Sequence, residues 1–188
     1  MKTFYKTLIS IYILTLLYVL FFDYKINIIV SLVLFIPTFY LKYDIYKIEY
    51  LGYVYLTQLL GSSVGLYNLP YYDKIMHFLS GIIFVIIGYI LFKKHISSKK
   101  ILYIVINCYE TAVAFLWEVF EYAGLVFFNY DASRHFTTGV HDTMQDMIFS
   151  FIAGLLVTYV IYKYPSYIDS LYIQRQDNLD QVSQQPHT

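Results

Sequence analysis

Three pairs of ionisable side chains, each separated by about one helical turn, stand out in this chain as groups that could do chemistry. The pairs are Asp73 with His77, Glu118 with Glu121, and Asp142 with Asp146. Side chains three or four positions apart lie on one face of a helix, so each pair presents two polar groups together. Carboxylates with an imidazole suit Mn, Fe, Zn or Mg better than copper, and an unbound carboxylate can act as a general base. All six residues are therefore predicted metal ligands, and the two glutamates are also the candidate catalytic residues.

The charge of these groups needs compensation wherever they gather in a region of low dielectric. Five carboxylates carry a formal charge of minus five when His77 is neutral. Protons on several carboxylates, nearby basic side chains or bound metal ions would each supply positive charge. The nearby basic residues are Lys74, Arg134, His135 and His141. The sequence lacks the Glu-x-x-His signature of di-metal sites in four-helix bundles, so the pattern indicates a metal without matching a known site.

Structural roles are the alternative explanation for three of these residues. Asp73 could cap the helix that follows Pro70, because aspartate is a favoured N-cap residue. Asp142 with Gln145 matches the spacing of a capping box. His77 alone would fit a hydrogen-bonded histidine in a protein core. These residues therefore have two interpretations, one in a metal site and one in helix capping or packing.

Glu118 and Glu121 have no capping role, because they lie well inside an apolar segment. Ionisable side chains within a membrane span cost at least about 2.5 kcal/mol each, so they are functional candidates by default. Glu110 lies in the same segment but has no acidic or histidine partner at helical spacing. We expect Glu110 to bond to a neighbouring helix rather than to join the site.

The elements that carry these pairs follow from an unusually apolar composition. Of the 188 residues, 59% are hydrophobic and 14% are charged, whereas soluble domains carry about 25% charged residues. The 13 basic residues balance 13 acidic ones, so no positive field exists to attract nucleic acid. A single cysteine, Cys108, excludes an intramolecular disulfide framework. The composition predicts an all-α, polytopic integral membrane helix bundle.

A bilayer core about 30 Å thick needs roughly 20 apolar residues per helical span. Long stretches with few charges predict about six transmembrane helices, at residues 5–22, 26–41, 50–69, 74–92, 101–128 and 142–162. The third is interrupted by Gly52, Gly61 and Gly65, which weaken a regular helix. Residues 1–164 therefore form one predicted transmembrane domain, and the polar residues 165–188 form a predicted disordered cytoplasmic tail.

Six spans would divide the 13 basic residues unevenly between the two sides of the membrane. Ten fall on the side of the two termini, and the other side holds Lys25, Lys74 and Arg134. Basic loops favour the cytoplasm, so both termini are predicted to be cytoplasmic. Along the chain, the fourth span then begins, the fifth ends and the sixth begins at the extracytoplasmic side. The three ionisable pairs would lie at similar depth there and share one cavity.

Three motifs resemble, in order and in spacing, the signatures of a bacterial inner-membrane family, the YjdF-like family. They are Tyr72-Asp73-Lys74-Ile75-Met76-His77-Phe78, Phe115-Leu116-Trp117-Glu118-Val119-Phe120-Glu121-Tyr122 and Asp142-Thr143-Met144-Gln145-Asp146-Met147. The same motifs are more distantly similar to the VanZ-like family, although Glu121 and Asp146 stand where VanZ-like chains tend to have Gln and Asn. The resemblance covers about residues 71–156 and implies a multi-pass protein of the bacterial cytoplasmic membrane.

Three roles are compatible with an acidic site near the extracytoplasmic face. As an enzyme, the protein would use a carboxylate-bound metal to activate water or to polarise a phosphate or ester of a lipid or envelope component. As a transport or binding protein, it would handle a cation or a proton through the same acidic groups. A structural membrane role without catalysis is the third. Membrane lipid is the expected partner in each case, nucleic acid is excluded, and the sequence leaves protein partners and a homo-oligomer open.

Overall fold

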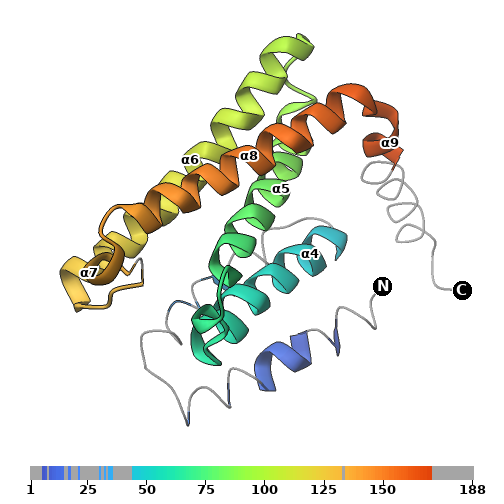
Figure 1. The fold of residues 1–188 in the computed structure, drawn as a ribbon. Helices are drawn as coiled ribbons and strands as arrows, with labels where there is room; N and C mark the ends of the chain where they lie inside the picture. Colours follow the sequence, from blue (N-terminus) through green and yellow to red (C-terminus); the bar gives the residue numbers. More distant parts are fainter. Residues whose placement is uncertain are drawn as a thin grey trace, which may run out of the picture. The chain divides into compact units, whose positions relative to one another are not determined.

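The computed structural model describes residues 44–132 and 134–170, together with scattered positions between residues 6 and 35 (Figure 1). Helices account for most of this part, which contains no β-strand. The predicted all-α fold is therefore confirmed. The first two predicted spans lie largely outside the described residues, as do residues 171–188 of the predicted tail. The chain divides into two compact units, Met1–Met76 and His77–Thr188.

The residues predicted as the third span, all in the first unit, form three consecutive helical elements. They are α4 (Asp44–Val54), the π-helix η1 (Tyr55–Ser63) and the short 3-10 helix η2 (Leu66–Asn68). The α-helix changes to a π-helix where the Thr57 hydroxyl donates to the carbonyl oxygens of Tyr53 and Val54, at 3.0 and 3.3 Å. A hydroxyl bonded to the preceding turn competes with regular helical geometry. Gly65 then turns the chain at φ 91°, a backbone conformation that favours glycine.

Three later helices are each long and apolar enough to cross a membrane. They are α5 (Tyr72–Phe92), α6 (Lys99–Phe128) and α8 (His141–Lys163). Their bounds agree with the predicted fourth, fifth and sixth spans to within two residues at each end. Because the described part of the chain holds three candidate spans, the count of six stays a prediction.

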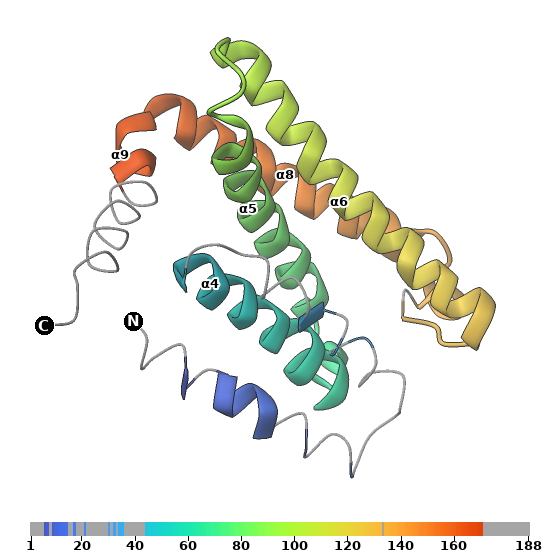
Figure 2. The ribbon, with the colours of Figure 1, turned by 180° about the vertical axis from the view of Figure 1, so that it is seen from behind.

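Within the second unit, α5, α6 and α8 lie side by side (Figure 1, Figure 2). Small residues let these helices approach closely, as is common in membranes. A Cβ atom on Gly81 of α5 would lie 2.1 Å from the carbonyl oxygen of Ser150 on α8. A Cβ atom on Gly154 of α8 would lie 3.1 Å from Glu110 Oε2 on α6 and 3.2 Å from Val85 on α5. The apolar core of the unit consists of Val85, Tyr89, Leu102, Ile106, Ile161 and Ile168.

The segments that flank α8 are short helices. A loop containing α7 (His135–Thr138) joins α6 to α8, and α9 (Pro165–Asp169) follows α8. The start of the predicted tail is therefore helical. Ile168 is buried in the apolar core, the Tyr89 hydroxyl donates to Asp169 Oδ1 at 3.0 Å, and Lys93 forms an ion pair with the same carboxylate. These contacts hold α9 against the end of α5, so the ordered domain extends past residue 164.

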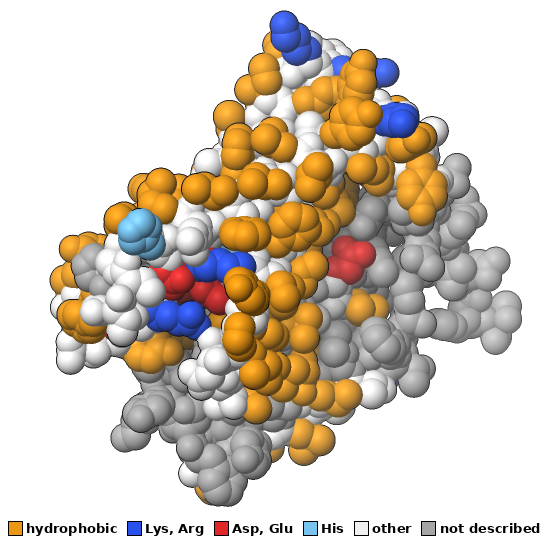
Figure 3. Space-filling model, viewed as in Figure 1, with side chains coloured by type: hydrophobic (Ala, Val, Ile, Leu, Met, Phe, Trp, Pro, Cys, Tyr) orange, Lys and Arg blue, Asp and Glu red, His pale blue; other side chains and the backbone are white. Residues whose placement is uncertain are grey.

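The exterior of the long helices is apolar. Large side chains that are more than half exposed include Leu116, Val126, Phe127, Leu156 and Tyr159. Figure 3 shows a face covered mostly by hydrophobic side chains, with one group of adjoining acidic and basic side chains. Soluble proteins rarely expose so much contiguous apolar surface, whereas lipid tails would cover it. The exterior therefore supports the predicted membrane location.

Candidate metal site

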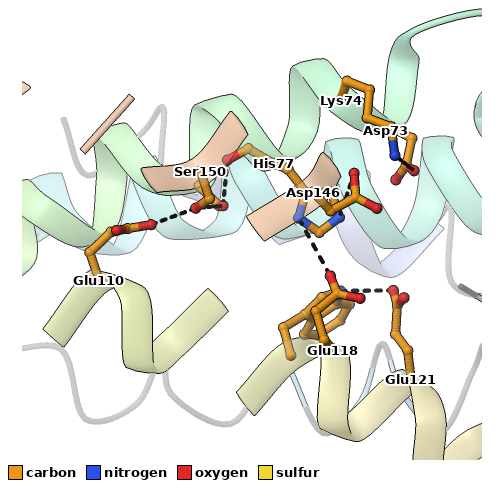
Figure 4. A network of polar contacts seen from close by, with 10 residues as sticks. Asp73, Lys74, His77, Glu110, Glu118, Glu121, Asp146 and Ser150 are labelled. Atoms are coloured by element: carbon orange, nitrogen blue, oxygen red, sulfur yellow. Dashed lines mark hydrogen bonds and ion pairs between the residues drawn. The ribbon is translucent and has the colours of Figure 1, made fainter. Parts of the chain in front are cut away.

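An imidazole and two carboxylates meet at the end of the second unit where α5 begins, α6 ends and α8 begins (Figure 4). The ring of His77 lies between the two acids. Its Nδ1 atom is 4.0 Å from Glu118 Oε1 on α6, and its Nε2 atom is 3.9 Å from Asp146 Oδ1 on α8. The alternating directions of the three helices thus bring together one member of each predicted pair.

Asp73 lies one turn before His77 on α5, a helix that runs without a break from Tyr72 to Phe92. One carboxylate oxygen each of Asp73 and Asp146 and one ring nitrogen of His77 lie within 4.8 Å of one another. Among the described residues, these three form the group whose ligand atoms could hold one metal ion. Two ligands bound at about 2.1 Å lie at most roughly 4.2 Å apart, so the group would close slightly around an ion.

The side chains at the centre of the site are buried. The exposed fraction is 8% for His77, 6% for Glu118 and 2% for Asp146. Charges interact strongly in such surroundings, and buried carboxylates require a positive partner. A protonated His77 would be one such partner, and the Lys74 Nζ atom lies 3.4 Å from Asp73 Oδ2. A divalent ion among the same oxygen and nitrogen atoms is a further source of positive charge.

Glu121 and Glu118 both lie near the C-terminal end of α6, but their side chains contact different residues. Glu121 Oε1 accepts a hydrogen bond of 2.8 Å from Trp117 Nε1, one turn earlier on the same helix. Figure 4 shows the two carboxylates on neighbouring positions of α6, with Glu118 directed toward the His77 ring. Neither glutamate belongs to the group formed by Asp73, His77 and Asp146. As metal ligands, both glutamates therefore stay predictions.

The capping alternative does not describe the start of α8, and for Asp73 on α5 it stays a prediction. Asp142 is buried in the first turn of α8, but Val140 occupies the N-cap position and makes no side-chain capping hydrogen bond. The capping box of Asp142 with Gln145 is therefore wrong. Asp73 likewise lies inside the first turn of α5, which begins at Tyr72. Acids in a first turn still interact favourably with the helix dipole. The side chain of His135 lies outside the described part.

A second polar group continues from the site into the bundle (Figure 4). Ser150 Oγ lies 2.6 Å from Glu110 Oε1 and 3.2 Å from Ser80 Oγ, and the Ser80 hydroxyl donates to the His77 carbonyl oxygen at 2.7 Å. The prediction that Glu110 bonds to a neighbouring helix is confirmed. Sequence reasoning missed both serines, because neutral hydroxyls are common in apolar spans. The available signal was spacing, since each serine follows a predicted site residue by about one turn.

Comparison with known proteins identifies a family. A family model described as a predicted membrane protein (DUF2238) matches residues 3–166. This family corresponds to the YjdF-like family that the three motifs resemble, so that resemblance is confirmed. No curated protein and no solved structure matches the chain.

Proposed function

Because the chain belongs to DUF2238, a family of predicted membrane proteins, we propose that its buried imidazole and carboxylates form a divalent metal site within the membrane region. The observation that carries this proposal is the position of the His77 ring, with a carboxylate facing each nitrogen at 3.9 and 4.0 Å. Metal-bound histidines commonly bind the ion through one nitrogen and donate the N–H of the other to a carboxylate. The His77 ring has a partner for each of these two roles.

The ligands in this proposal are His77 Nε2, Asp73 and Asp146. Glu118 would accept the Nδ1–H and orient the ring once its Oε1 atom, now 4.0 Å from Nδ1, approaches to about 3 Å. This division agrees with the group of three whose atoms lie within 4.8 Å. Two ligands bound at about 2.1 Å in a tetrahedral arrangement lie about 3.4 Å apart, so His77 Nε2 and Asp146 Oδ1, now 3.9 Å apart, would approach by about half an ångström. Carboxylate oxygens with one imidazole fit Mn, Fe, Zn or Mg.

An ion held here would activate water or polarise a phosphate or ester of a lipid or envelope component. Glu118 and Glu121 are the nearby carboxylates that could accept a proton in such a reaction. The setting that we propose is the extracytoplasmic side of the bacterial cytoplasmic membrane, with both chain termini cytoplasmic. The apolar exterior of α5, α6 and α8 supports the membrane location, and the uneven distribution of basic residues supports this direction.

Metal content and thermal stability of the detergent-purified protein test the proposal. We expect about one divalent ion per chain and a melting temperature that falls in chelator and recovers with Mn²⁺ or Zn²⁺, because an ion bound only to the folded state stabilises it. His77→Ala and Asp146→Asn should lose both the ion and the recovery. His95→Ala is the matched control, because His95 is exposed beyond the end of α5. A metal-free wild type that melts identically in chelator and in excess metal would refute the site.

Cation or proton handling is the second candidate function. Its support is the burial of Glu118 and His77 inside candidate membrane spans, where ionisable side chains commonly mark ion and proton pathways. Flux measurements on vesicles that contain the purified protein separate the two functions. A flux of protons or metal ions that Glu118→Gln abolishes would favour transport. A metal-loaded protein that carries no flux would favour the enzyme.

A further inference from the structure

Glu110 is another buried acid, and the proposed metal site does not use it. It lies on α6 eight residues before Glu118, about 12 Å away along the helix axis. Its side chain is 1% exposed. An unpaired carboxylate is very costly at such a position, so the groups that surround Glu110 decide its chemical state.

The groups that contact Glu110 are neutral. Ser150 Oγ lies 2.6 Å from Oε1, and Thr111 Oγ1 lies 3.3 Å from Oε2. Gly154 of α8 leaves the space that the carboxyl group occupies, and a Cβ atom there would also meet Val85 of α5. Within the described part of the chain, no basic side chain pairs with Glu110. Burial without a positive partner favours a carboxyl group that carries a proton.

Titratable groups on the helices packed against Glu110 lie farther along those helices. Asp146 precedes Ser150 by four residues on α8, and His77 precedes Ser80 by three on α5. Toward the other end of α5, Tyr89 bonds to Asp169. Glu110 is therefore connected to the metal site by hydroxyl groups rather than by a neighbouring charge.

The hydroxyl hydrogens around Glu110 can be counted. If Glu110 is ionised, Ser150 donates to it and Ser80 donates to the His77 carbonyl oxygen, so the 3.2 Å contact between the serines has no hydrogen. If Glu110 carries a proton, it donates to Ser150, Ser150 to Ser80, and Ser80 to that carbonyl oxygen. Each of these three contacts then has its own hydrogen. A metal ion fits this contact less well. Two oxygen atoms that each bind the same ion at about 2.3 Å or more lie farther apart than the 2.6 Å between Ser150 Oγ and Glu110 Oε1.

We infer that Glu110 is a proton-binding site, connected through Ser150 and Ser80 to the turn of α5 that carries His77. When Glu110 loses its proton to solvent, the Ser150 hydroxyl turns and donates to the carboxylate, while Ser80 keeps donating to the His77 carbonyl oxygen. Each hydroxyl keeps its one hydrogen, and the proton that leaves is the one on Glu110. The inference rests on the contacts of Glu110 and does not require a metal ion at the neighbouring site.

Infrared spectroscopy of the full-length, detergent-purified protein tests for the proton on Glu110. A neutral carboxyl group has a C=O stretching band separate from that of a carboxylate. We expect such a band at neutral pH in the wild type, a shift of the band with isotope-labelled glutamate, and its loss in Glu110→Gln. Glu121→Gln is the matched control and should keep the band. A wild type without any glutamate-derived band of this kind would overturn the inference.

Hydrogen–deuterium exchange tests the connection through the serines. Ser150→Ala removes a hydroxyl that stabilises the ionised carboxylate formed during exchange, so the Glu110 band should move and its exchange in D₂O should slow by about tenfold. Thr158→Val is the control, because it removes another hydroxyl of α8, one that accepts from Asn107 and lies outside the chain. Its exchange should match the wild type. Equal exchange rates in Ser150→Ala and Thr158→Val would overturn the connection, even if the carboxyl band is present.

Discussion

Glu118 faces a ring nitrogen of His77 at 4.0 Å, so its charge acts on the proposed ion through the ring. Glu118→Gln keeps the size of the side chain and removes this charge. We expect the variant to bind Zn²⁺ or Mn²⁺ about 10- to 100-fold more weakly, the usual effect of losing a carboxylate that orients a ligand histidine. In chelator it should melt no lower than the wild type, because it relieves repulsion between buried carboxylates. Calorimetric titration and melting curves measure the two effects.

Comparison with Asp146→Asn decides between the two roles of Glu118. A complete loss of binding in both variants would show that Glu118 is itself a ligand. Unchanged affinity in Glu118→Gln would remove it from the site. Glu121→Gln serves as a control for charge, because Glu121 bonds to Trp117 and should leave the affinity close to that of the wild type.

Residue spacing identified side chains that the structure brings together at the candidate site, but not their partners. Asp73 and His77 were identifiable because two ionisable groups one turn apart are costly in an apolar span. The same spacing places Glu118 and Glu121 close together, yet Glu121 bonds to Trp117, and that choice depends on side-chain rotamers that spacing does not encode. Ser80 carries no charge, so its position in the hydrogen-bond chain became apparent from the coordinates alone.

Close approach between α5 and α8 depends on the missing side chain of Gly81. A Cβ atom there would lie 2.1 Å from the Ser150 carbonyl oxygen, and backbone cannot move aside as a flexible side chain can. Gly81→Ala should therefore lower the free energy of unfolding by about 1–3 kcal/mol. The matched control is Gly52→Ala in α4, where no atom lies within 4 Å and alanine favours the helix by up to about 1 kcal/mol. Melting curves in detergent that show equal effects would contradict this packing of α5 on α8.

The long helices were predictable, because the length of a stretch with few charged residues indicates whether it can span a membrane. The bounds of α5, α6 and α8 match the predicted bounds to within two residues. Local geometry was less predictable. The change from α-helix to π-helix depends on which carbonyl oxygens the Thr57 hydroxyl contacts. The start of α8 at His141 places Val140 at the N-cap, although Asp142 is the better capping residue by type.

Direction in the membrane is a property of the whole chain, and the apolar exterior of the long helices does not determine it. The distribution of basic residues supplies the direction, because residues 93–100 contain four lysines in the loop between α5 and α6 and the start of α6. The loop between α6 and α8 contains Arg134. This asymmetry predicts a cytoplasmic first loop and an extracytoplasmic second loop. The proposed metal site, at the end of α6 near the second loop, would then face outward.

Cysteine labelling tests this orientation directly. Cys108 is exposed on α6 and is first replaced by serine, and single cysteines are then introduced as Ser97→Cys before α6 and Thr138→Cys in α7 after it. If α6 crosses the membrane once, the two positions lie on opposite sides. A membrane-impermeant thiol reagent should label Thr138→Cys in intact cells and should reach Ser97→Cys only after lysis. The reverse pattern would place the metal site at the cytoplasmic face and exclude a substrate in the outer leaflet, and labelling of both positions from outside would show that α6 does not span the bilayer.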